Sequence, residues 1–313
     1  MQYYQKCIAL GSMTGLSLIS DAPATAIEHL YRELWKAIFV FERRYSRFLP
    51  DSELSTLNRN AGMKQYISSD FRDLLVTARD MAFQTDGMYN PFVLPAVQAT
   101  GYRHSRVPGR ENDVIDDHAN KTVASIDRLE IGDNWARIPY GTALDLGGIG
   151  KGYLAERLRD RLPDLVTGYW LSLGGDIAVG GNDTNGQPWK VMIESADNQI
   201  DERDNFIVAT PCGVATSGTT VHRGTTAGRN WHHIIDPRTR KPAKTDVLLA
   251  SVQHASPLMA DVLASCAVIL GSKHAVTYLK LHGVKAAVLQ CKTNNQTHTI
   301  SFGHTLTRDV VHA

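Results

Sequence analysis

Two stretches in the first third of the chain repeat apolar residues every three or four positions. The first predicts a helix that is opened by Asp21 and Pro23 and ends at the basic pair Arg43-Arg44. The second predicts a helix with Ser69 or Asp70 as its N-cap. Both helices would bury one apolar face. Their inward positions are Ile27, Leu30, Tyr31, Leu34, Ile38 and Phe41 in the first, and Phe71, Leu74, Leu75, Ala78 and Met81 in the second.

Beyond residue 120 most apolar runs are short and are separated by residues that favour turns. Runs of this length are typical of strands. Because most of them follow one another without an intervening helix, we predict mostly antiparallel sheets flanked by helices, the α+β class. Further helices are predicted at 258–270 and 273–282. The predicted strands are 8–19 near the N-terminus, 129–131, 135–138, 142–146, 169–173, 177–179, 189–193, 206–209, 214–216, 233–235, 248–254, 286–290 and 297–300.

Two segments lack a regular apolar period. Residues 46–60 are polar with isolated aromatics and predict a loop that runs into a short helix. Residues 101–120 are rich in Arg, His, Asp, Gly and Pro, which predicts an exposed loop. There is no internal repeat and no linker composition. We therefore expect one domain over residues 1–313, within which two subdomains would enclose an active site in a cleft.

Composition narrows the class of function. Hydrophobic residues make up 43% of the 313 residues and charged residues 21%, as in soluble globular proteins. The net charge is +1 and no sustained basic run occurs, which argues against nucleic acid or a membrane surface as partner. No apolar stretch approaches the length of a membrane span. Function is therefore expected in a local site.

The cysteines and the N-terminus indicate the compartment. Cys7, Cys212, Cys266 and Cys291 lie far apart and form no Cys-x-x-Cys pair, so we expect buried thiols and neither a zinc site nor a disulfide scaffold. Residues 1–18 lack the unbroken apolar core of a signal peptide. As written, the sequence predicts a cytoplasmic protein, or a chain whose leader is absent from it.

The most distinctive stretch is ALDLGGIGKGYL at residues 143–154. It predicts a short strand, a tight turn with four glycines, and a helix whose apolar face holds Leu154, Leu158 and Leu162. Glycine accepts φ > 0 and lets a ligand approach the backbone. The helix N-terminus and the charge of Lys151 would attract an anion. The stretch therefore predicts a cradle for phosphate or pyrophosphate.

The same glycines have a second interpretation, because they also permit close packing of a strand against a helix. Their spacing matches neither G-x-G-x-x-G nor the Walker form that ends in Gly-Lys-Ser/Thr, so a nucleotide fold of either kind is not supported. The motifs elsewhere in the chain decide between the two interpretations.

Residues 145–153, DLGGIGKGY, resemble the central motif of the FAD:protein FMN transferase (ApbE) family. Further segments resemble this family in the expected order, so that the resemblance spans roughly residues 40–271. An ordered set is far more specific than any one motif. The segments are YSRF at 45–48, DSEL at 51–54, LN at 57–58, TDG at 85–87, LGGDI at 173–177, ATSG at 215–218, HHIIDPRT at 232–239, ADVLAS at 260–265 and LG at 270–271.

The resemblance implies an ApbE-like (T-fold-like) architecture with a central cleft and a Mg²⁺-dependent transferase. Such an enzyme binds FAD, breaks its pyrophosphate, joins FMN to a Thr or Ser hydroxyl of a target flavoprotein and releases AMP. Two alternatives stay open: an FAD pyrophosphatase that uses water in place of that hydroxyl, and a flavin-binding protein without turnover. Many relatives are periplasmic lipoproteins, whereas Cys7 lacks the apolar run that precedes a lipidated cysteine.

Asp261 and Ser265 lie four residues apart on a predicted helix, which places a carboxylate and a hydroxyl on one face about one turn apart. Mg²⁺ is a hard cation that prefers such oxygen ligands. The pattern alone favours a solvated Asp261 on the helix surface. The resemblance implies that Asp261, Ser265 and the backbone carbonyl of Gly150 hold Mg²⁺, although relatives more often have Thr at position 265.

His232 and His233 are adjacent at the start of a predicted strand, so their side chains should point to opposite faces. A neutral imidazole suits a base that accepts a proton from a hydroxyl, although a histidine can also simply hydrogen-bond a strand end. The resemblance favours His233 as the base. Asp236 would brace the following turn or the histidine, and Arg240 stands where the family commonly has Gly.

The remaining candidates would contact the flavin nucleotide. Asp176 offers an acceptor for the isoalloxazine imide, residues 216–217 offer donors for phosphate or ribityl oxygens, and Phe48 offers a ring for stacking. Each also has a plain interpretation as a turn or core residue. We expect the catalytic residues to be His233, Asp261 and Lys151. The expected FAD-binding residues are Phe48, Asp145, Gly147, Gly148, Lys151, Gly175, Asp176, Thr216, Ser217 and His233.

Overall fold

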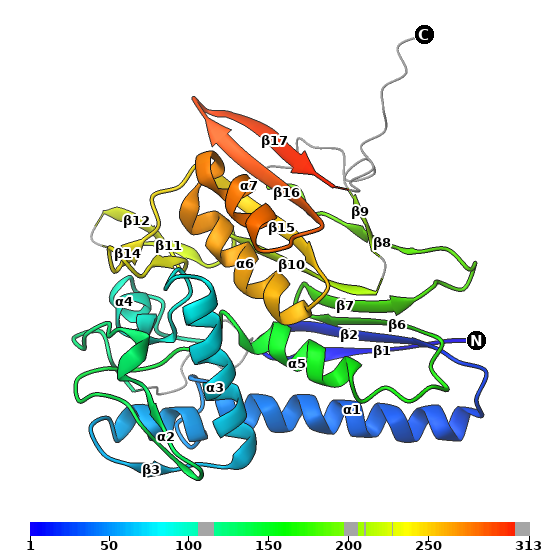
Figure 1. The fold of residues 1–313 in the computed structure, drawn as a ribbon, viewed down its shortest axis with the longest axis horizontal. Coiled ribbons are helices and arrows are strands. Elements are labelled where there is room, and N and C mark those ends of the chain that lie inside the picture. Colours follow the sequence, from blue (N-terminus) through cyan, green and yellow to red (C-terminus); the bar gives the residue numbers. More distant parts are fainter. Residues whose placement is uncertain (106–115, 197–205, 210, 227, 304–313) are drawn as a thin grey trace.

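An antiparallel sheet of eight strands forms the centre of the computed structural model, in the order β1-β2-β6-β7-β10-β15-β16-β17 (Figure 1). The structure describes residues 1–105, 116–196, 206–209, 211–226 and 228–303. It confirms the predicted α+β class. The strands of the large sheet are β1 Gln2–Ala9, β2 Ser12–Ile19, β6 Gly168–Leu173, β7 Asp176–Gly181, β10 Cys212–Gly218, β15 Val247–His254, β16 Ala286–Thr293 and β17 Gln296–Phe302.

The other elements are shorter strands and seven α-helices among the described residues. The small sheets pair β8 Trp189–Met192 with β9 Phe206–Ala209, β11 Arg223–Thr226 with β12 Arg229–His232, and β13 Ile235–Asp236 with β14 Lys241–Pro242, and place β5 Trp135–Arg137 between β3 Gln65–Tyr66 and β4 Glu130–Ile131. The helices are α1 Ala24–Tyr45, α2 Glu53–Arg59, α3 Ser69–Gln84, α4 Leu94–Ala99, α5 Gly150–Arg159, α6 Pro257–Leu270 and α7 Ser272–Leu281, with 3₁₀ turns at Pro91–Val93 and Ile126–Arg128.

The large sheet buries side chains on both faces. Along β7, Ala178 packs with α1 and α5, whereas Ile177 and Val179 pack with the β8–β9 hairpin. This alternation follows from the two-residue period of a strand. A larger core joins α3, α6 and α7 to the inner strands β10, β15 and β16. The sheet therefore holds α5 and α6 side by side on one face (Figure 1).

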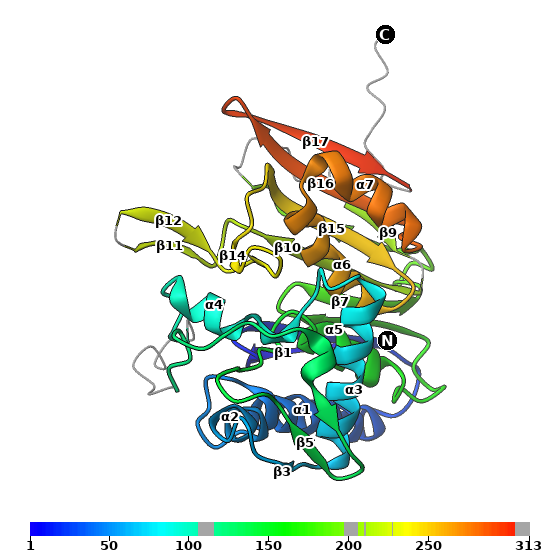
Figure 2. The same ribbon diagram turned by 60° about the vertical axis from the view of Figure 1, so that its left-hand side comes forward.

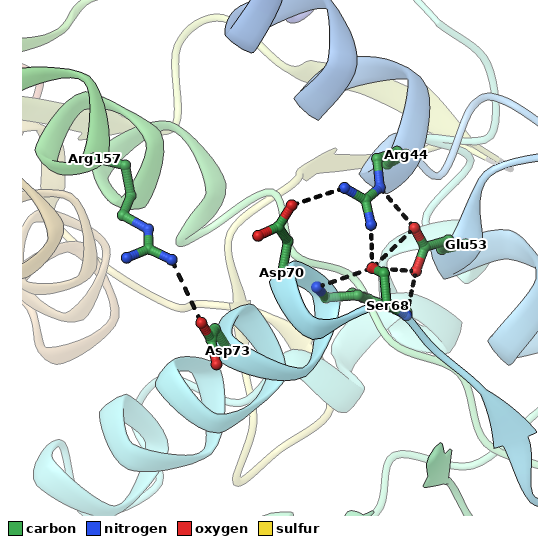
Figure 3. A network of polar contacts seen from close by, with 7 residues as sticks. Arg44, Glu53, Ser68, Asp70, Asp73 and Arg157 are labelled. Atoms are coloured by element: carbon green, nitrogen blue, oxygen red, sulfur yellow. Dashed lines mark hydrogen bonds and ion pairs between the residues drawn. The ribbon is translucent and has the colours of Figure 1, made fainter. Parts of the chain in front are cut away.

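Polar contacts connect the end of α1 with α2 and α3 (Figure 3). Arg44 at the end of α1 donates to Glu53 of α2 at 2.6 Å, and Ser68 donates to the same carboxylate at 2.8 Å. Arg157 of α5 pairs with Asp73 of α3 at 3.5 Å. The contacts of Glu53 join α1, α2 and the start of α3, and so fix the connection between α1 and α2. The Arg157–Asp73 pair joins α5 to α3.

The predicted strand at 8–19 is wrong as a single element, because the structure has the hairpin β1–β2 there. Leu10 and Gly11 form its turn, with φ of 55° and 79°. A two-residue turn with both φ positive matches the twist of the strands that it joins. Leucine rarely occupies such a position, so the turn has no clear signal among the residues.

The N-cap of α3 is Ser68, not Ser69 or Asp70. Its hydroxyl accepts a hydrogen bond from the N–H of Phe71 at 3.2 Å. The predicted exposed loop at 101–120 is described only in part, because residues 106–115 lie outside the described residues. In the described part Ser105 and His118 are buried, so the prediction of exposure is wrong for these two side chains.

All four cysteines are free thiols, and Cys212, Cys266 and Cys291 are buried, as predicted. Cys7 is only partly buried. Within the described ranges no helix combines the length and apolarity that crossing a bilayer requires.

Candidate active site

Residues 142–146 are not a strand, contrary to the prediction. The side-chain amide of Asn58 binds both backbone groups of Leu144, accepting from its N–H at 2.7 Å and donating to its carbonyl at 2.9 Å. The N–H of Asp145 donates to the carbonyl of Pro91 at 2.7 Å. An amide side chain and a neighbouring loop thus replace the partner strand. They fix the segment that leads into the glycine turn.

The glycine turn ends at α5, whose N-terminus meets α6. The N–H of Gly152 donates to Oδ2 of the buried Asp261 at 2.9 Å. A Cβ at position 152 would lie 2.7 Å from Cβ of Asp261 and 2.7 Å from the carbonyl oxygen of Pro257. Only glycine permits this approach. The close packing brings the first turn of α5 onto the carboxylate of α6.

The expectation of positive φ at Gly147 and Gly148 is wrong. The N–H of Gly147 donates to Oδ1 of Asp145 at 2.7 Å, and neither glycine has a left-handed backbone. The left-handed glycines near the site are Gly174 and Gly175, with φ of 67° and 97°. They form the two-residue turn between β6 and β7 that delivers Asp176.

Three charged side chains gather where α5, α6 and β7 meet. The ammonium of Lys151 forms an ion pair with Asp176, which is 4% exposed. Burial raises the pKa of Asp261 to about 7, and the charge of Asp176 adds to this, while Lys151 and the N–H of Gly152 oppose it. Burial lowers the pKa of Lys151, but the two carboxylates outweigh it and the net pKa is raised. Lys151 therefore stays protonated.

Ser265 lies one turn beyond Asp261 on α6. Its hydroxyl is 2.9 Å from that of Ser217 on β10, while Thr216 is bound to Ser251 at 2.8 Å. Ser217 is therefore linked through Ser265 to α6, the helix that carries Asp261. Thr216 is engaged with β15, the next strand of the sheet.

His233 lies between β12 and β13, so the predicted strand at 233–235 is broken there. Its ring lies edge-on to His222 at 4.9 Å and to Tyr102 at 6.2 Å between ring centroids. Although part of the residue reaches solvent, burial of the ring, with lesser effects from His222, His232 and Lys151, lowers the pKa of His233 to about 3. The imidazole is therefore neutral at physiological pH.

His232 has a different environment. Its Nε2 lies 3.0 Å from the carbonyl oxygen of Ala243, a backbone contact beside the β13–β14 turn. Asp236 accepts from the N–H of Arg238 at 2.9 Å and from its guanidinium at 2.9 Å, so it braces the turn. Arg240 has φ of 58°, a left-handed conformation that favours glycine.

The β11–β12 hairpin projects past α4 (Figure 2). Its Trp231 and Tyr102, from the segment after α4, form an aromatic wall beside the site. It is tied to the end of α4 by Thr226, whose hydroxyl donates to the carbonyl of Thr100 at 2.9 Å. Trp231 and Tyr102 stack with ring centroids 6.4 Å apart. The aromatic wall is thus built from two segments far apart in sequence.

Phe48 lies on the same side as Tyr102, with ring centroids 6.0 Å apart. The guanidinium of Arg47 lies 4.1 Å from the ring centroid of Phe48, and its Nε is 3.2 Å from Oδ2 of Asp145. Arg47 is nearly buried, with 6% of its side chain exposed. A buried Arg–Asp pair thus links the half-buried Phe48 to the glycine turn.

A groove of about 910 Å³ lies between β1 and α1, and a pocket of about 230 Å³ lies near Arg223 and Lys292. Neither is lined by a predicted site residue. Because buried charges need compensation, we take the cluster of Lys151, Asp176 and Asp261 as the functional centre.

A model of the ApbE family matches residues 10–289, which is most of the chain. The chain belongs to the ApbE family. It is similar to the FAD:protein FMN transferase of Haemophilus influenzae, with 24% identity over 91% of this chain and 85% of the relative. The FAD:protein FMN transferase of Treponema pallidum is 26% identical over 89% of this chain and 82% of its own length.

Solved structures of ApbE proteins share the fold. The apo flavinyl transferase ApbE of Pseudomonas stutzeri has a TM-score of 0.79 and 21% identity over 96% of this chain and 94% of its own. The flavin transferase ApbE of Vibrio cholerae has a TM-score of 0.77 and 23% identity over 96% of this chain and 97% of its own.

Four residues near the candidate site were not predicted from the sequence: Arg47 beside Asp145, Tyr89 beside Gly148, and the stacked pair Tyr102 and His222. Arg47 precedes Phe48 in the YSRF segment, but no local pattern indicates that it is buried and paired with Asp145. Tyr102 and His222 have no local pattern, because they meet only through the β11–β12 hairpin.

Replacing Gly148 with alanine tests whether the glycine turn is a cradle. A Cβ there would lie 3.6 Å from the ring of Tyr89, an ordinary contact, so we expect a thermal midpoint close to that of the parent. If the nucleotide approaches this backbone, FAD affinity measured by fluorescence quenching should fall at least about tenfold. Gly152→Ala is the contrasting variant and should lose stability. Parent-like FAD affinity in Gly148→Ala would make the turn a packing device.

Acid should destabilise the protein through His233. In the unfolded chain this histidine binds a proton below its ordinary pKa of 6.5, whereas in the folded chain it does so only near a pKa of 3. Unfolding therefore takes up a proton between these values, and stability falls as the pH falls through that window. We expect the denaturation midpoint of the parent to drop between pH 7 and pH 5, and that of His233→Gln to drop less. The control is His29→Gln at an exposed position of α1, whose midpoint should drop as much as that of the parent. An equal drop in the parent and in His233→Gln would refute the role of His233.

Proposed function

We propose that this protein is a Mg²⁺-dependent enzyme that transfers FMN from FAD to a Thr or Ser hydroxyl of another protein and releases AMP. The names of its relatives support the transfer of FMN from FAD to protein. The observation that carries the proposal is that the buried carboxylates of Asp176 and Asp261 lie together with the partly exposed ammonium of Lys151 at the N-terminus of α5.

This cluster suits a pyrophosphate. The N-terminus of α5 presents the positive end of the helix dipole, while the N–H groups of Gly150 and Gly152 already donate to Leu146 and Asp261. Lys151 adds a full positive charge next to the first turn. Because the surroundings are largely buried, these charges act on a bound anion more strongly than they would in water. The group that they would bind is the pyrophosphate of FAD.

The donor set also fits Mg²⁺. Among the described residues no group of three or more His, Cys, Asp or Glu could hold a metal ion. A cation here would depend on Asp261, the hydroxyl of Ser265 and the carbonyl of Gly150, completed by water and substrate oxygens, which Mg²⁺ accepts. Burial raises the pKa of Asp261 to about 7, and a cation would favour its charged form. When bound, Mg²⁺ supplies charge neutralisation on the pyrophosphate.

His233 is the proposed base. The acceptor hydroxyl gives its proton to the neutral imidazole as its oxygen bonds to the phosphorus on the FMN side of FAD. The bond from that phosphorus to the bridging oxygen breaks, and AMP leaves with the bridging oxygen and the electron pair. The imidazolium then returns the proton to solvent. His232 is held by the carbonyl of Ala243 and is left out of this step.

The test follows the nucleotide products. Purified protein is incubated with FAD and a flavoprotein that carries an acceptor Thr, either with Mg²⁺ or with EDTA. We expect AMP to appear with Mg²⁺ in an amount equal to the acceptor-bound FMN, and no AMP with EDTA. FMN and AMP released in equal amounts without bound FMN would support the pyrophosphatase instead. No cleavage of FAD under either condition would contradict both activities.

A further inference from the structure

Tyr89 lies beside the glycine turn although it belongs to the segment after α3. Asp86 and Gly87 reverse the chain there, with φ of 51° and 75°. The N–H of Tyr89 then donates to Oγ1 of Thr85 at 3.1 Å, and its ring enters the main core. The ring lies against Gly148, since a Cβ on that glycine would be 3.6 Å from Cε2 of Tyr89.

The hydroxyl of Tyr89 is buried, and no hydrogen-bond partner for it occurs among the described residues. The whole residue is only 8% exposed. A buried hydroxyl without a partner destabilises the fold, because its lost hydration is not replaced by a hydrogen bond. Phenylalanine would fill the same space without this cost. Because Tyr89 also lies against the glycine turn, its hydroxyl can take the missing partner from a bound ligand.

Two carboxylates of the site act electrostatically on this hydroxyl. Burial raises the pKa of Tyr89 well above its ordinary value, and the charges of Asp145 and Asp261 raise it further. Both carboxylates already accept hydrogen bonds, Asp145 from Gly147 and Asp261 from Gly152. The contact of its ring with Gly148 places Tyr89 beside the glycine turn, and its hydroxyl donates to neither carboxylate.

We propose that the hydroxyl of Tyr89 donates a hydrogen bond to an oxygen at the bound diphosphate group and holds it against the glycine turn. The oxygen is either a phosphoryl oxygen or that of a water held by the cation. The inference rests on the proposed function for the identity of the ligand. It adds a neutral donor to the charged groups of Lys151 and the α5 N-terminus.

The test uses Tyr89→Phe, which removes only the hydroxyl. Tyr45→Phe is the matched control, because its hydroxyl is also buried without a partner but lies on α1, stacked on Phe71 at 5.2 Å between ring centroids. Thermal midpoints are measured without ligand, to show that each variant folds. Affinity for FAD and for ADP is then measured by titration, each with Mg²⁺ and with EDTA, and no turnover is needed.

We expect both variants to melt at or above the parent's midpoint, because each loses an unsatisfied hydroxyl. Only Tyr89→Phe should bind FAD and ADP at least about tenfold more weakly, the effect of losing a hydrogen bond to a charged acceptor. A loss that persists in EDTA assigns the bond to a phosphoryl oxygen, and one seen only with Mg²⁺ assigns it to the water. Parent-like affinity in Tyr89→Phe would overturn the inference. If the parent itself bound neither nucleotide, the proposed function would fail first.

Discussion

Asp261→Asn should lower FMN transfer by at least about a hundredfold without lowering the stability of the free protein. Asparagine keeps the size of the side chain and an oxygen that can accept from the N–H of Gly152. It removes a charge whose burial, next to Asp176, raises the pKa of Asp261. The thermal midpoint without ligand should therefore stay the same or rise. The measurements are transfer rate over a range of Mg²⁺ concentrations and thermal denaturation.

Asp246→Asn is the matched control. Asp246 accepts from the N–H of Ser272 at 2.9 Å and caps α7, away from the cluster. The hydrogen bonds from the N–H and the hydroxyl of Ser272 outweigh burial and lower the pKa of Asp246, so the charged form of Asp246 stabilises the fold. We expect this variant to lose stability and to keep transfer once folded. Wild-type transfer with unchanged Mg²⁺ dependence in Asp261→Asn would show that the metal assignment is wrong.

His233→Ala should lower transfer by about 10²–10⁴-fold and leave FAD affinity largely unchanged. A base acts on the acceptor hydroxyl and contributes little to holding the nucleotide. The rate is measured at saturating FAD with a flavoprotein acceptor, and FAD affinity is measured by fluorescence quenching. A parallel loss of both quantities would indicate that His233 binds the nucleotide.

His232→Ala separates the two adjacent histidines. This variant loses the contact with the carbonyl of Ala243, so we expect a loss of about 1 kcal/mol in unfolding free energy and near-normal transfer. A transfer defect confined to His232→Ala would reverse the assignment of the base.

The large elements could be predicted because burial and periodicity agree in them. Ile27, Leu34 and Ile38 of α1 are buried as their spacing required, and so are Phe71 and Leu74 of α3. The inner strands β7, β10, β15 and β16 follow apolar runs for the same reason. A one-sided pattern of apolar residues is sufficient where a whole helix face or strand enters the core.

The short elements depend on contacts that a local pattern does not contain. Leu144 is held by Asn58, 86 residues away in the chain, so its segment is extended without joining a sheet. The β11–β12 hairpin is positioned by Thr226 against Thr100. Neither link is visible in a window of a few residues. For this reason β3, β11, β12 and β14 were not predicted, whereas β4, β5, β8 and β9 lie within predicted strands.

The candidate site shows the same difference between features that a local motif indicates and features that depend on distant contacts. The resemblance named Lys151, Asp176 and Asp261, and the structure brings these three together from α5, β7 and α6. It could not indicate the paired Arg47 or the unpaired hydroxyl of Tyr89, because both follow from three-dimensional packing. The expected left-handed glycines were also misplaced, since Gly174 and Gly175 take that conformation in place of Gly147 and Gly148.

The most direct test of FMN transfer by this site is the intact mass of an acceptor flavoprotein after incubation with the protein, FAD and Mg²⁺. A variant acceptor whose Thr is replaced by Val serves as the control, because it lacks the hydroxyl. The proposed reaction predicts that the unmodified acceptor gains the mass of one FMN group and that the control gains none. An acceptor of unchanged mass, in a reaction where FAD is nonetheless cleaved to FMN and AMP, would contradict transfer to a protein hydroxyl.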